Sequence, residues 1–197
     1  GDRIIIYMPM IPEAVIAMLA CARIGAIHSV VFGGFASNEL ASRIDDSKAK
    51  ILITASCGFE PGRTVEYKPL VDEAIKRANH KVEKTILFQR SGYEVKLKAP
   101  DEISWDEAIS NAKETDCVEM SSNEFAYILY TSGTTGTPKG IVRDIGGHIV
   151  ALKWTMKNIY NIDADDIWWS ASDIGWIVGH SYIVYAPLFK GCTTVLF

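Results

Sequence analysis

Residues 3–32 read RIIIYMPMIPEAVIAMLACARIGAIHSVVF, and this stretch decides the fold. Arg3–Met8 is a run of β-branched and aromatic residues, which is typical of a strand. Pro12–Ile24 predicts a helix so apolar that it must be buried on most sides, and Ile27–Phe32 predicts a second strand. The order strand, helix, strand is that of a β-α-β unit, whose two strands run parallel.

The same rhythm continues further along the chain. Ser37–Asp46 fits a helix and Lys50–Thr54 a third strand. Val65–Ala78 carries its apolar residues on one helical stripe, and the strand-like run Lys84–Phe88 follows it. We therefore predict an α/β fold with a largely parallel sheet and flanking helices.

The middle of the chain is more polar. Arg90–Asp101 predicts a long surface loop. Ser104, with Glu107 three residues later, forms the pattern of a capping box at the start of a helix. That helix is expected to turn four side chains inward: Trp105, Ala108, Ile109 and Ala112.

The second half returns to alternating elements. Phe125–Tyr130 predicts a strand, Gly140–Arg143 a short strand, and Gly147–Tyr160 a helix. Ile167–Ala171 predicts another strand, in which Trp168 and Trp169 are expected to pack in a core. The last residues, 192–197, form one more strand-like run. A strand at a chain terminus needs partners, so we interpret the chain as part of a longer one.

Composition excludes several classes of function. The chain has 197 residues, is 48% hydrophobic and carries a formal net charge of −4. Its basic residues are scattered, so nothing indicates a nucleic-acid partner. The four cysteines lie far apart, without the spacing of a zinc site. Pro9, Pro12 and Glu13 interrupt the apolar start, which argues against a membrane span or a signal peptide.

One loop has an unusual composition. Thr131–Gly140 reads TSGTTGTPKG, with small and hydroxylated side chains, one lysine and no carboxylate. Backbone N–H groups, hydroxyls and a point charge suit phosphate oxygens. The Walker A pattern fails because Pro138 stands where its second glycine belongs. The alternative is a flexible surface turn, since turns have this composition.

The order of residues in this loop favours phosphate binding. YTSGTTGTPKG resembles the signature loop of the adenylate-forming enzymes, which include acyl-CoA synthetases, peptide-synthetase adenylation domains and luciferases. Residues 1–37 and 171–191 are similar to the short-chain acyl-CoA synthetases, the subgroup that contains acetyl- and propionyl-CoA synthetases. The resemblance implies that residues 1–197 are an internal fragment of the large amino-terminal AMP-binding domain. The carboxyl-terminal lid domain would then lie beyond Phe197.

The resemblance implies a reaction in two halves. ATP and a short-chain carboxylate form an acyl-adenylate and pyrophosphate, and coenzyme A then takes the acyl group and releases AMP. ATP, Mg²⁺ and coenzyme A are the implied cofactor and substrates. Thr131 and Lys139 would be catalytic, and no residue is assigned as a metal ligand. The implied ATP- and phosphate-binding residues are Thr131, Ser132, Gly133, Thr134, Thr135, Gly136 and Lys139.

A second segment is implied to bind coenzyme A. Glu60, Pro61, Gly62 and Arg63 stand where short-chain acyl-CoA synthetases carry an arginine-glycine segment that contacts the nucleotide end of coenzyme A. Gly62 would allow close approach, and Arg63 would pair with a phosphate. The pattern of acetyl-CoA synthetases begins with arginine, so Glu60 is a departure. A solvated surface arginine is the alternative for Arg63.

A third segment is implied to line the acyl pocket. It contains Trp176, Ile177 and Val178, an aromatic wall beside a β-branched residue that fits a very short aliphatic chain. Acetyl-CoA synthetases carry threonine at the position of Val178, whereas propionyl-CoA synthetases tend to carry valine, so propionate is favoured over acetate. The sequence RDIGG, residues 143–147, is also similar to propionyl-CoA synthetases.

Histidine and aspartate near this segment invite other roles. His180 could be a general base, but a carboxylate that is already ionised needs none, so a structural or positioning role is favoured. Asp173 is interpreted as a helix cap. His28, His80 and His148 are interpreted as packing or surface residues.

Two other functions stay open from the residues alone. The chain could belong to an adenylation domain that loads a carrier protein, against which the Glu60–Arg63 segment argues. It could also be a nucleotide-binding module without catalysis. The implied partners are small molecules, not nucleic acid or membrane. The implied location is the cytoplasm, or the mitochondrial matrix in a eukaryote.

Overall fold

The central sheet grows outward from β1. A computed structural model describes residues 1–131 and 138–197. In it, β1 (Arg3–Tyr7) pairs in parallel with β2 (Ile27–Val30) on one side and with β3 (Ile51–Ala55) on the other. The chain passes from β1 to β2 through α1 (Pro12–Arg23) and from β2 to β3 through α2 (Ser37–Ser47). The β-α-β unit predicted over residues 3–32 is confirmed.

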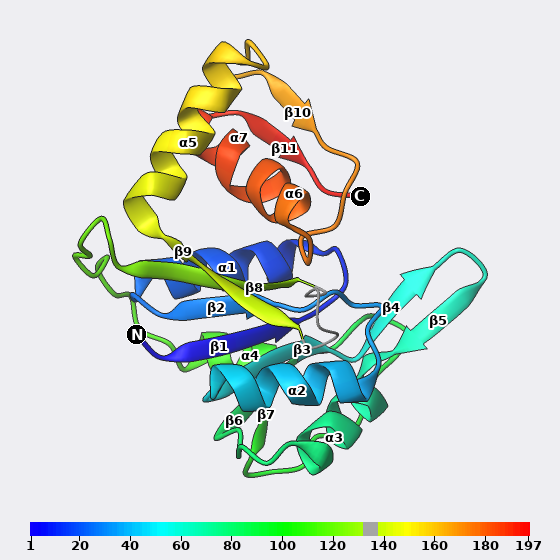
Figure 1. Cartoon of the computed structure of the whole chain (residues 1–197). Coiled ribbons are helices and arrows are strands. Elements are labelled where there is room, and N and C mark those ends of the chain that lie inside the picture. Colours follow the sequence, from blue (N-terminus) through cyan, green and yellow to red (C-terminus); the bar gives the residue numbers. More distant parts are fainter. Residues whose placement is uncertain (132–137) are drawn as a thin grey trace.

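The large sheet has seven strands in the order β7-β6-β3-β1-β2-β8-β9. β6 (Lys84–Phe88) pairs with β3, and β7 (Glu102–Ser104) pairs with β6, both in parallel. β8 (Phe125–Thr131) pairs in parallel with β2, whereas β9 (Lys139–Asp144) runs antiparallel to β8 (Figure 1). The predicted α/β fold with a largely parallel sheet is confirmed.

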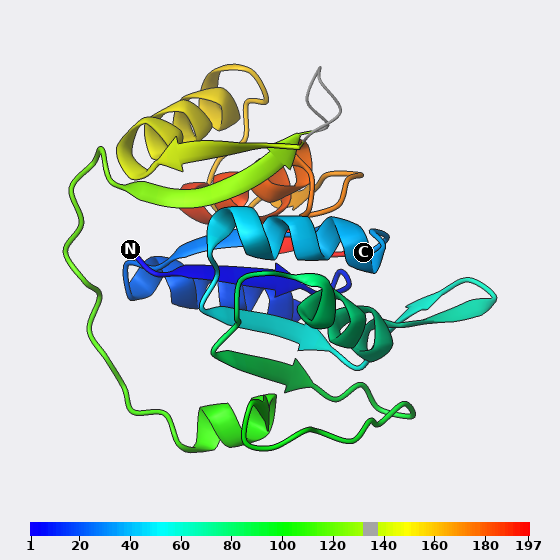
Figure 2. The ribbon, with the colours of Figure 1, turned by 60° about the horizontal axis from the view of Figure 1, so that its bottom comes forward.

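Side chains of β1 alternate between two hydrophobic clusters. Ile4 and Ile6 belong to the cluster that contains the buried face of α1. Ile5 and Tyr7 belong to the cluster that contains α2 and α3 (Tyr67–Arg77). Because neighbouring side chains of a strand point to opposite faces, helices cover the sheet on both sides (Figure 2).

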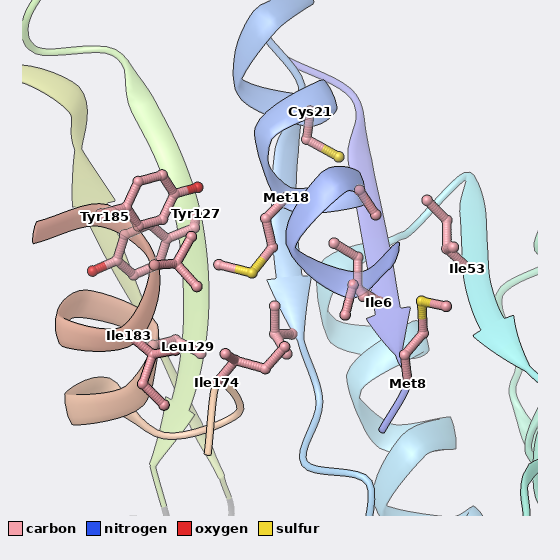
Figure 3. Packing of buried hydrophobic residues seen from close by; sticks show 14 of the residues in the cluster. Ile6, Met8, Met18, Cys21, Ile53, Tyr127, Leu129, Ile174, Ile183 and Tyr185 are labelled. Carbon is pink, nitrogen blue, oxygen red and sulfur yellow. The ribbon is translucent and has the colours of Figure 1, made fainter. Parts of the chain in front are cut away.

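The last part of the chain packs against the α1 side of the sheet. The helical segments are α5 (Ile145–Asn158), α6 (Ile177–Gly179), the π-helix η1 (His180–Tyr185) and α7 (Ala186–Lys190). Strands β10 (Ile167–Trp169) and β11 (Thr193–Val195) form a small parallel sheet beside them. Figure 3 shows Met18 of α1 directed toward Tyr127 of β8, with Ile183 of η1 nearby in the same cluster.

One hairpin differs from the sequence-based expectation. β4 (Cys57–Glu60) and β5 (Arg63–Glu66) pair antiparallel, and Figure 1 shows the hairpin projecting from the body of the protein. The helix expected from Val65 begins at Tyr67 instead, because Val65 pairs with Gly58 and Glu66 with Cys57.

The helix after the polar loop is shorter than expected. The Ser104 hydroxyl accepts a hydrogen bond from the Glu107 N–H at 3.0 Å, so the predicted cap is confirmed. α4 (Trp105–Ser110) has only six residues. Ile109 is 57% exposed and Ala112 lies beyond the end of the helix, so the expectation that both point inward is wrong.

The two neighbouring tryptophans of β10 differ in environment. Trp168 packs against the core, and its indole N–H donates to the Tyr182 carbonyl at 2.6 Å. Trp169 is 59% exposed, so its expected core position is wrong. Successive side chains of a strand point to opposite faces, and only one face of β10 is covered in this chain.

Two further observations concern the cysteines and the helices. All four cysteines are free thiols. Within the described residues, we find no helix with the length and apolar character that a membrane span requires.

Candidate functional site

The three segments implied to bind substrate come together at one edge of the sheet. β8 ends at Thr131, and the β4–β5 hairpin follows the carboxyl end of β3. Trp176 contacts the ring of Phe32, which lies just after β2. β3, β2 and β8 run parallel, so their carboxyl ends lie on the same edge (Figure 1). Open α/β sheets bind ligands at this edge.

The two residues that flank the predicted phosphate loop form the last pair of the β8–β9 ladder. Thr131 and Lys139 are cross-strand partners, and both are exposed. Directly opposed side chains of an antiparallel pair lie on the same face, about 5 Å apart at Cβ. The fold thus brings together the two residues predicted to be catalytic. The other predicted phosphate ligands lie outside the described residues: Ser132, Gly133, Thr134, Thr135 and Gly136.

The segment implied to bind coenzyme A is the turn of the β4–β5 hairpin. Pro61 and Gly62 form the turn, and Gly62 has a φ of +78°, a conformation that favours glycine. The Arg63 guanidinium donates to the Glu60 carboxylate through Nε and Nη2, each at 2.6 Å. The Arg63 side chain is 71% exposed. Glu60, the residue that departs from the acetyl-CoA synthetase pattern, therefore holds this guanidinium at the tip of the hairpin.

Trp176 lies in an aromatic cradle. Its ring centroid is 5.2 Å from that of Phe32 and 5.8 Å from that of Phe35. Gly175 makes this approach possible, because a Cβ there would lie 2.7 Å from the Phe32 Cα and 2.8 Å from its backbone nitrogen. Sequence reasoning missed Phe32 and Phe35, although Phe32 ends a predicted strand and Phe35 follows it closely, which was a usable signal.

Ile177 and Val178 face a different space from Trp176. They line a cavity of about 420 Å³ between the start of α5 and η1. The cavity wall also contains Arg143, Asp144, Gly147, His148, Ala151, Leu152, Ser181 and Tyr182. The three predicted acyl-pocket residues are thus contiguous, but Trp176 contacts Phe32 and Phe35 while the other two line the cavity.

Asp173 does not cap a helix. Its carboxylate accepts a hydrogen bond from the Gly175 N–H at 2.7 Å and closes a turn two residues long. α6 begins at Ile177, and its N-cap is Trp176. The helix-cap prediction is therefore wrong. Burial raises the pKa of the Asp173 carboxyl, and the hydrogen bond from Gly175 opposes this.

A buried pair of histidines ties this segment to the sheet. His180 Nδ1 lies 3.1 Å from the Ile174 carbonyl oxygen, and His180 Nε2 lies 3.1 Å from His28 Nε2. A carbonyl oxygen only accepts hydrogen bonds, so His180 carries its proton on Nδ1. Its Nε2 is therefore unprotonated and acts as an acceptor. His28 must then donate from its own Nε2. This assignment leaves His28 Nδ1 as a bare acceptor, in agreement with the lack of a hydrogen-bond partner at that buried atom.

Burial keeps these rings neutral. It lowers the pKa of His180 to about 3 and that of the nearby His148 to about 4. Burial, followed by the influence of His180 and His148, holds the pKa of His28 well below its usual value. The structural role favoured for His180 fits this geometry, whereas the pairing with His28 across 152 residues of sequence was not foreseen.

The fold and the placement of these segments define a class of protein. The chain belongs to the AMP-binding enzyme family, whose model matches residues 1–197. It is 56% identical to the human acyl-CoA synthetase short-chain family member 3, mitochondrial, over 198 residues. It is 45% identical over 200 residues to an acetyl-coenzyme A synthetase of Xylella fastidiosa.

A solved structure agrees with these sequence relatives. The chain resembles an acetoacetyl-CoA synthetase from Streptomyces lividans with a TM-score of 0.88 and 25% identity. Each match covers 100% of this chain. The chain spans 29% of the length of the human and the Streptomyces proteins and 31% of that of the Xylella protein. The expected membership of the AMP-binding family is confirmed, and so is the expected similarity to short-chain acyl-CoA synthetases.

The buried histidines predict how stability depends on pH. The folded-state pKa of His180, about 3, lies below the ordinary value of 6.5, so the unfolded state binds more protons between these values. The free energy of unfolding should therefore fall as the pH is lowered from 6.5, by at most about 1.4 kcal/mol per pH unit for this one group. Denaturant unfolding at pH 7, 6 and 5.5 would measure the slope, with His180→Gln as the variant of reduced slope.

Imidazole nitrogen spectra of the folded protein would assign this effect directly. We expect His180 to remain neutral at pH 5.5 with its proton on Nδ1, and His28 to carry its proton on Nε2. The same protein in urea is the control, where all histidines should titrate near their ordinary pKa of about 6.5. A cationic signal from His180 at pH 5.5 in the folded protein would contradict the assignment.

Proposed function

We propose that this chain is an internal part of the amino-terminal domain of an ATP-dependent, AMP-forming acyl-CoA synthetase that acts on a short-chain carboxylate. Propionate is the favoured acid and acetate the next. The observation that carries the proposal is the meeting of the three implied segments at the carboxyl edge of one sheet. Membership of the AMP-binding enzyme family supports the same reading.

In the first half-reaction, a carboxylate oxygen of the acid attacks the α-phosphorus of ATP. A P–O bond forms there, the bond to the β-phosphate bridge breaks, and pyrophosphate leaves with both electrons of that bond. Negative charge grows on the oxygens around the phosphorus, and an exposed Lys139 beside Thr131 can stabilise it. An ionised carboxylate needs no general base, which agrees with a neutral, buried His180.

In the second half-reaction, the thiolate of coenzyme A attacks the acyl carbon of the adenylate. A C–S bond forms, the C–O bond to the phosphate breaks, and AMP leaves. Arg63 is proposed to hold a phosphate of coenzyme A in fork geometry. Because its guanidinium is paired with Glu60, that phosphate would have to share or replace the carboxylate.

Mg²⁺ would be carried by the nucleotide. Magnesium in such sites keeps several waters and binds substrate phosphates with one or two carboxylates. Among residues 1–131 and 138–197, no three metal-binding side chains gather into a possible metal site. The proposed location stays the cytoplasm, or the mitochondrial matrix in a eukaryote.

The first prediction from this proposed function concerns Lys139 in the full-length protein. Lys139→Ala should slow propionate-dependent ATP–pyrophosphate exchange by about 100- to 1,000-fold, because a charge-stabilising donor in a transition state has about this effect. Lys153→Ala, which removes an exposed lysine of α5, is the control and should leave the exchange rate unchanged. An unchanged rate in Lys139→Ala would remove this residue from the phosphate site.

The second prediction tests whether Arg63 binds coenzyme A and not ATP. Arg63→Ala should raise the KM for coenzyme A roughly 10- to 100-fold, the range expected for a charge-assisted hydrogen bond. Pyrophosphate exchange, which needs no coenzyme A, should be nearly unchanged. Arg77→Ala removes another exposed arginine that is paired with a glutamate, and it serves as the control. Equal losses in both assays would indicate a folding defect instead.

The third prediction concerns acyl length. Val178→Gly opens the cavity wall, so the ratio of butyrate to propionate efficiency should rise, by about 10- to 200-fold per methylene accommodated at most. Val178→Thr nearly preserves shape and should shift preference toward acetate only modestly. Val150→Thr, on the exposed side of α5, is the control. AMP formation with acetate, propionate and butyrate would measure the ratios, and unchanged ratios would exclude Val178 from the pocket.

A further inference from the structure

A buried arginine on α2 lies between the two ends of the proposed site. Arg43 is 4% exposed. Its Nη1 donates to the Glu39 carbonyl at 2.7 Å and to the Glu39 carboxylate at 2.8 Å. Burying a charge is costly unless it is well paired, and Glu39 supplies one carboxylate, itself 40% exposed. Two aromatic rings complete the environment of the guanidinium.

One of these rings belongs to the strand that carries the phosphate loop. The guanidinium carbon of Arg43 lies 5.2 Å from the centroid of the Tyr130 ring, and Tyr130 directly precedes Thr131. The Tyr130 hydroxyl donates to the Asp46 carboxylate at 2.6 Å. The carboxyl end of β8 is thus held to α2 by a ring contact and a hydrogen bond.

The other ring is that of Phe35, one of the two phenylalanines that pack against Trp176 in the segment implied to line the acyl pocket. The Arg43 guanidinium carbon lies 4.6 Å from the centroid of Phe35. The edge of Phe35 meets the ring of Trp176, with 5.8 Å between centroids and an interplanar angle of 77°. A continuous series of contacts therefore runs from Trp176 through Phe35 and Arg43 to Tyr130.

We propose that Arg43 is a positioning residue that sets the distance between the Trp176 segment and the carboxyl end of β8, which carries Thr131. The inference rests on the proposed function, since only the adenylation step requires an acid on one segment and ATP on the other. Reacting atoms must be held about 3 to 3.5 Å apart and aligned, and a displacement of about 1 Å can cost 100-fold in rate. A planar guanidinium in contact with two rings fixes spacing in a way that the flexible ammonium of lysine does not.

This role predicts a loss confined to one half-reaction. Arg43→Lys in the full-length protein should lower kcat for propionate-dependent pyrophosphate exchange by roughly 10- to 100-fold. The KM values for ATP and propionate should change by less than about 3-fold, because each substrate still binds its own segment. Thioester formation from added propionyl-adenylate and coenzyme A should keep its rate, since the bond between acyl group and phosphate already exists.

Two matched variants sharpen the comparison. Tyr130→Leu removes the ring and should reproduce the Arg43→Lys pattern. Arg77→Lys, an exposed arginine of α3, is the control for the chemical change itself. If Arg43→Lys does not fold, as judged by thermal unfolding, Phe35→Leu must show the same confined loss, and its failure to do so would overturn the proposal.

The remaining outcomes each overturn the proposal. Equal losses in exchange and in thioester formation would make Arg43 a purely structural residue. A raised KM for ATP with unchanged kcat would mean that the positive charge of Arg43 favours ATP binding from a distance and does not position the reacting groups. If the unaltered protein shows no exchange with any short-chain acid, the proposed function fails and this inference fails with it. Exchange by the unaltered protein distinguishes the first two cases from the last.

Discussion

The parallel pairing of β1 with both β2 and β3 is the constraint on which the rest of the structure depends. Ile5, Ile6 and Tyr7 are completely buried in it, so helices must cover both faces. Because the paired strands run in one direction, every segment that leaves a carboxyl end starts from the same edge. The hairpin, the aromatic cradle and the phosphate-loop strand are gathered there by strand direction, before any side chain contributes.

Side-chain contacts then fix the position of the segment from Ile174 to His180 against the sheet. Gly175 lets its segment approach the Phe32 backbone, so Trp176 contacts the chain just after β2. The His28–His180 hydrogen bond holds η1 to β2, and His180 also holds the Ile174 carbonyl. The segment with Ile177 and Val178 is therefore fixed at both of its ends by contacts with the sheet. The proposed acyl pocket would need such rigid walls to discriminate between acids that differ by one methylene.

Sequence patterns predicted this arrangement unevenly. The strands of residues 3–55 and helix α1 follow from apolar runs, and α2 follows from the helical spacing of Leu40, Ala41 and Ile44. The β4–β5 hairpin was missed because its exposed Glu60, Arg63 and Thr64 lack the alternation of a half-buried strand. The side chain of Trp169 was misplaced because a strand pattern does not say which of its faces is covered.

The candidate site shows the same limit. The order of residues in Thr131–Gly140 led to the prediction of a phosphate site, and the family resemblance led to the prediction of a coenzyme A contact at Glu60–Arg63. The contacts that relate these segments to each other involve residues far apart in sequence, such as Tyr130 with Asp46 and His28 with His180. A single sequence holds no signal for such pairs. Arg43 is an exception, because a sequence signal for it exists. It lies on the same helical face as Leu40, Ala41 and Ile44 of α2, so its position in the sequence predicts a buried arginine.

A crystal structure of the full-length protein with an unreactive propyl ester of AMP would test the central claim most directly. The account predicts the ester phosphate within hydrogen-bonding distance of Thr131 and Lys139, at the end of the β8–β9 ladder. It predicts the propyl chain against Val178, with the Arg43 guanidinium still between the rings of Phe35 and Tyr130. A phosphate bound away from this edge of the sheet, or a propyl chain remote from Val178, would contradict it.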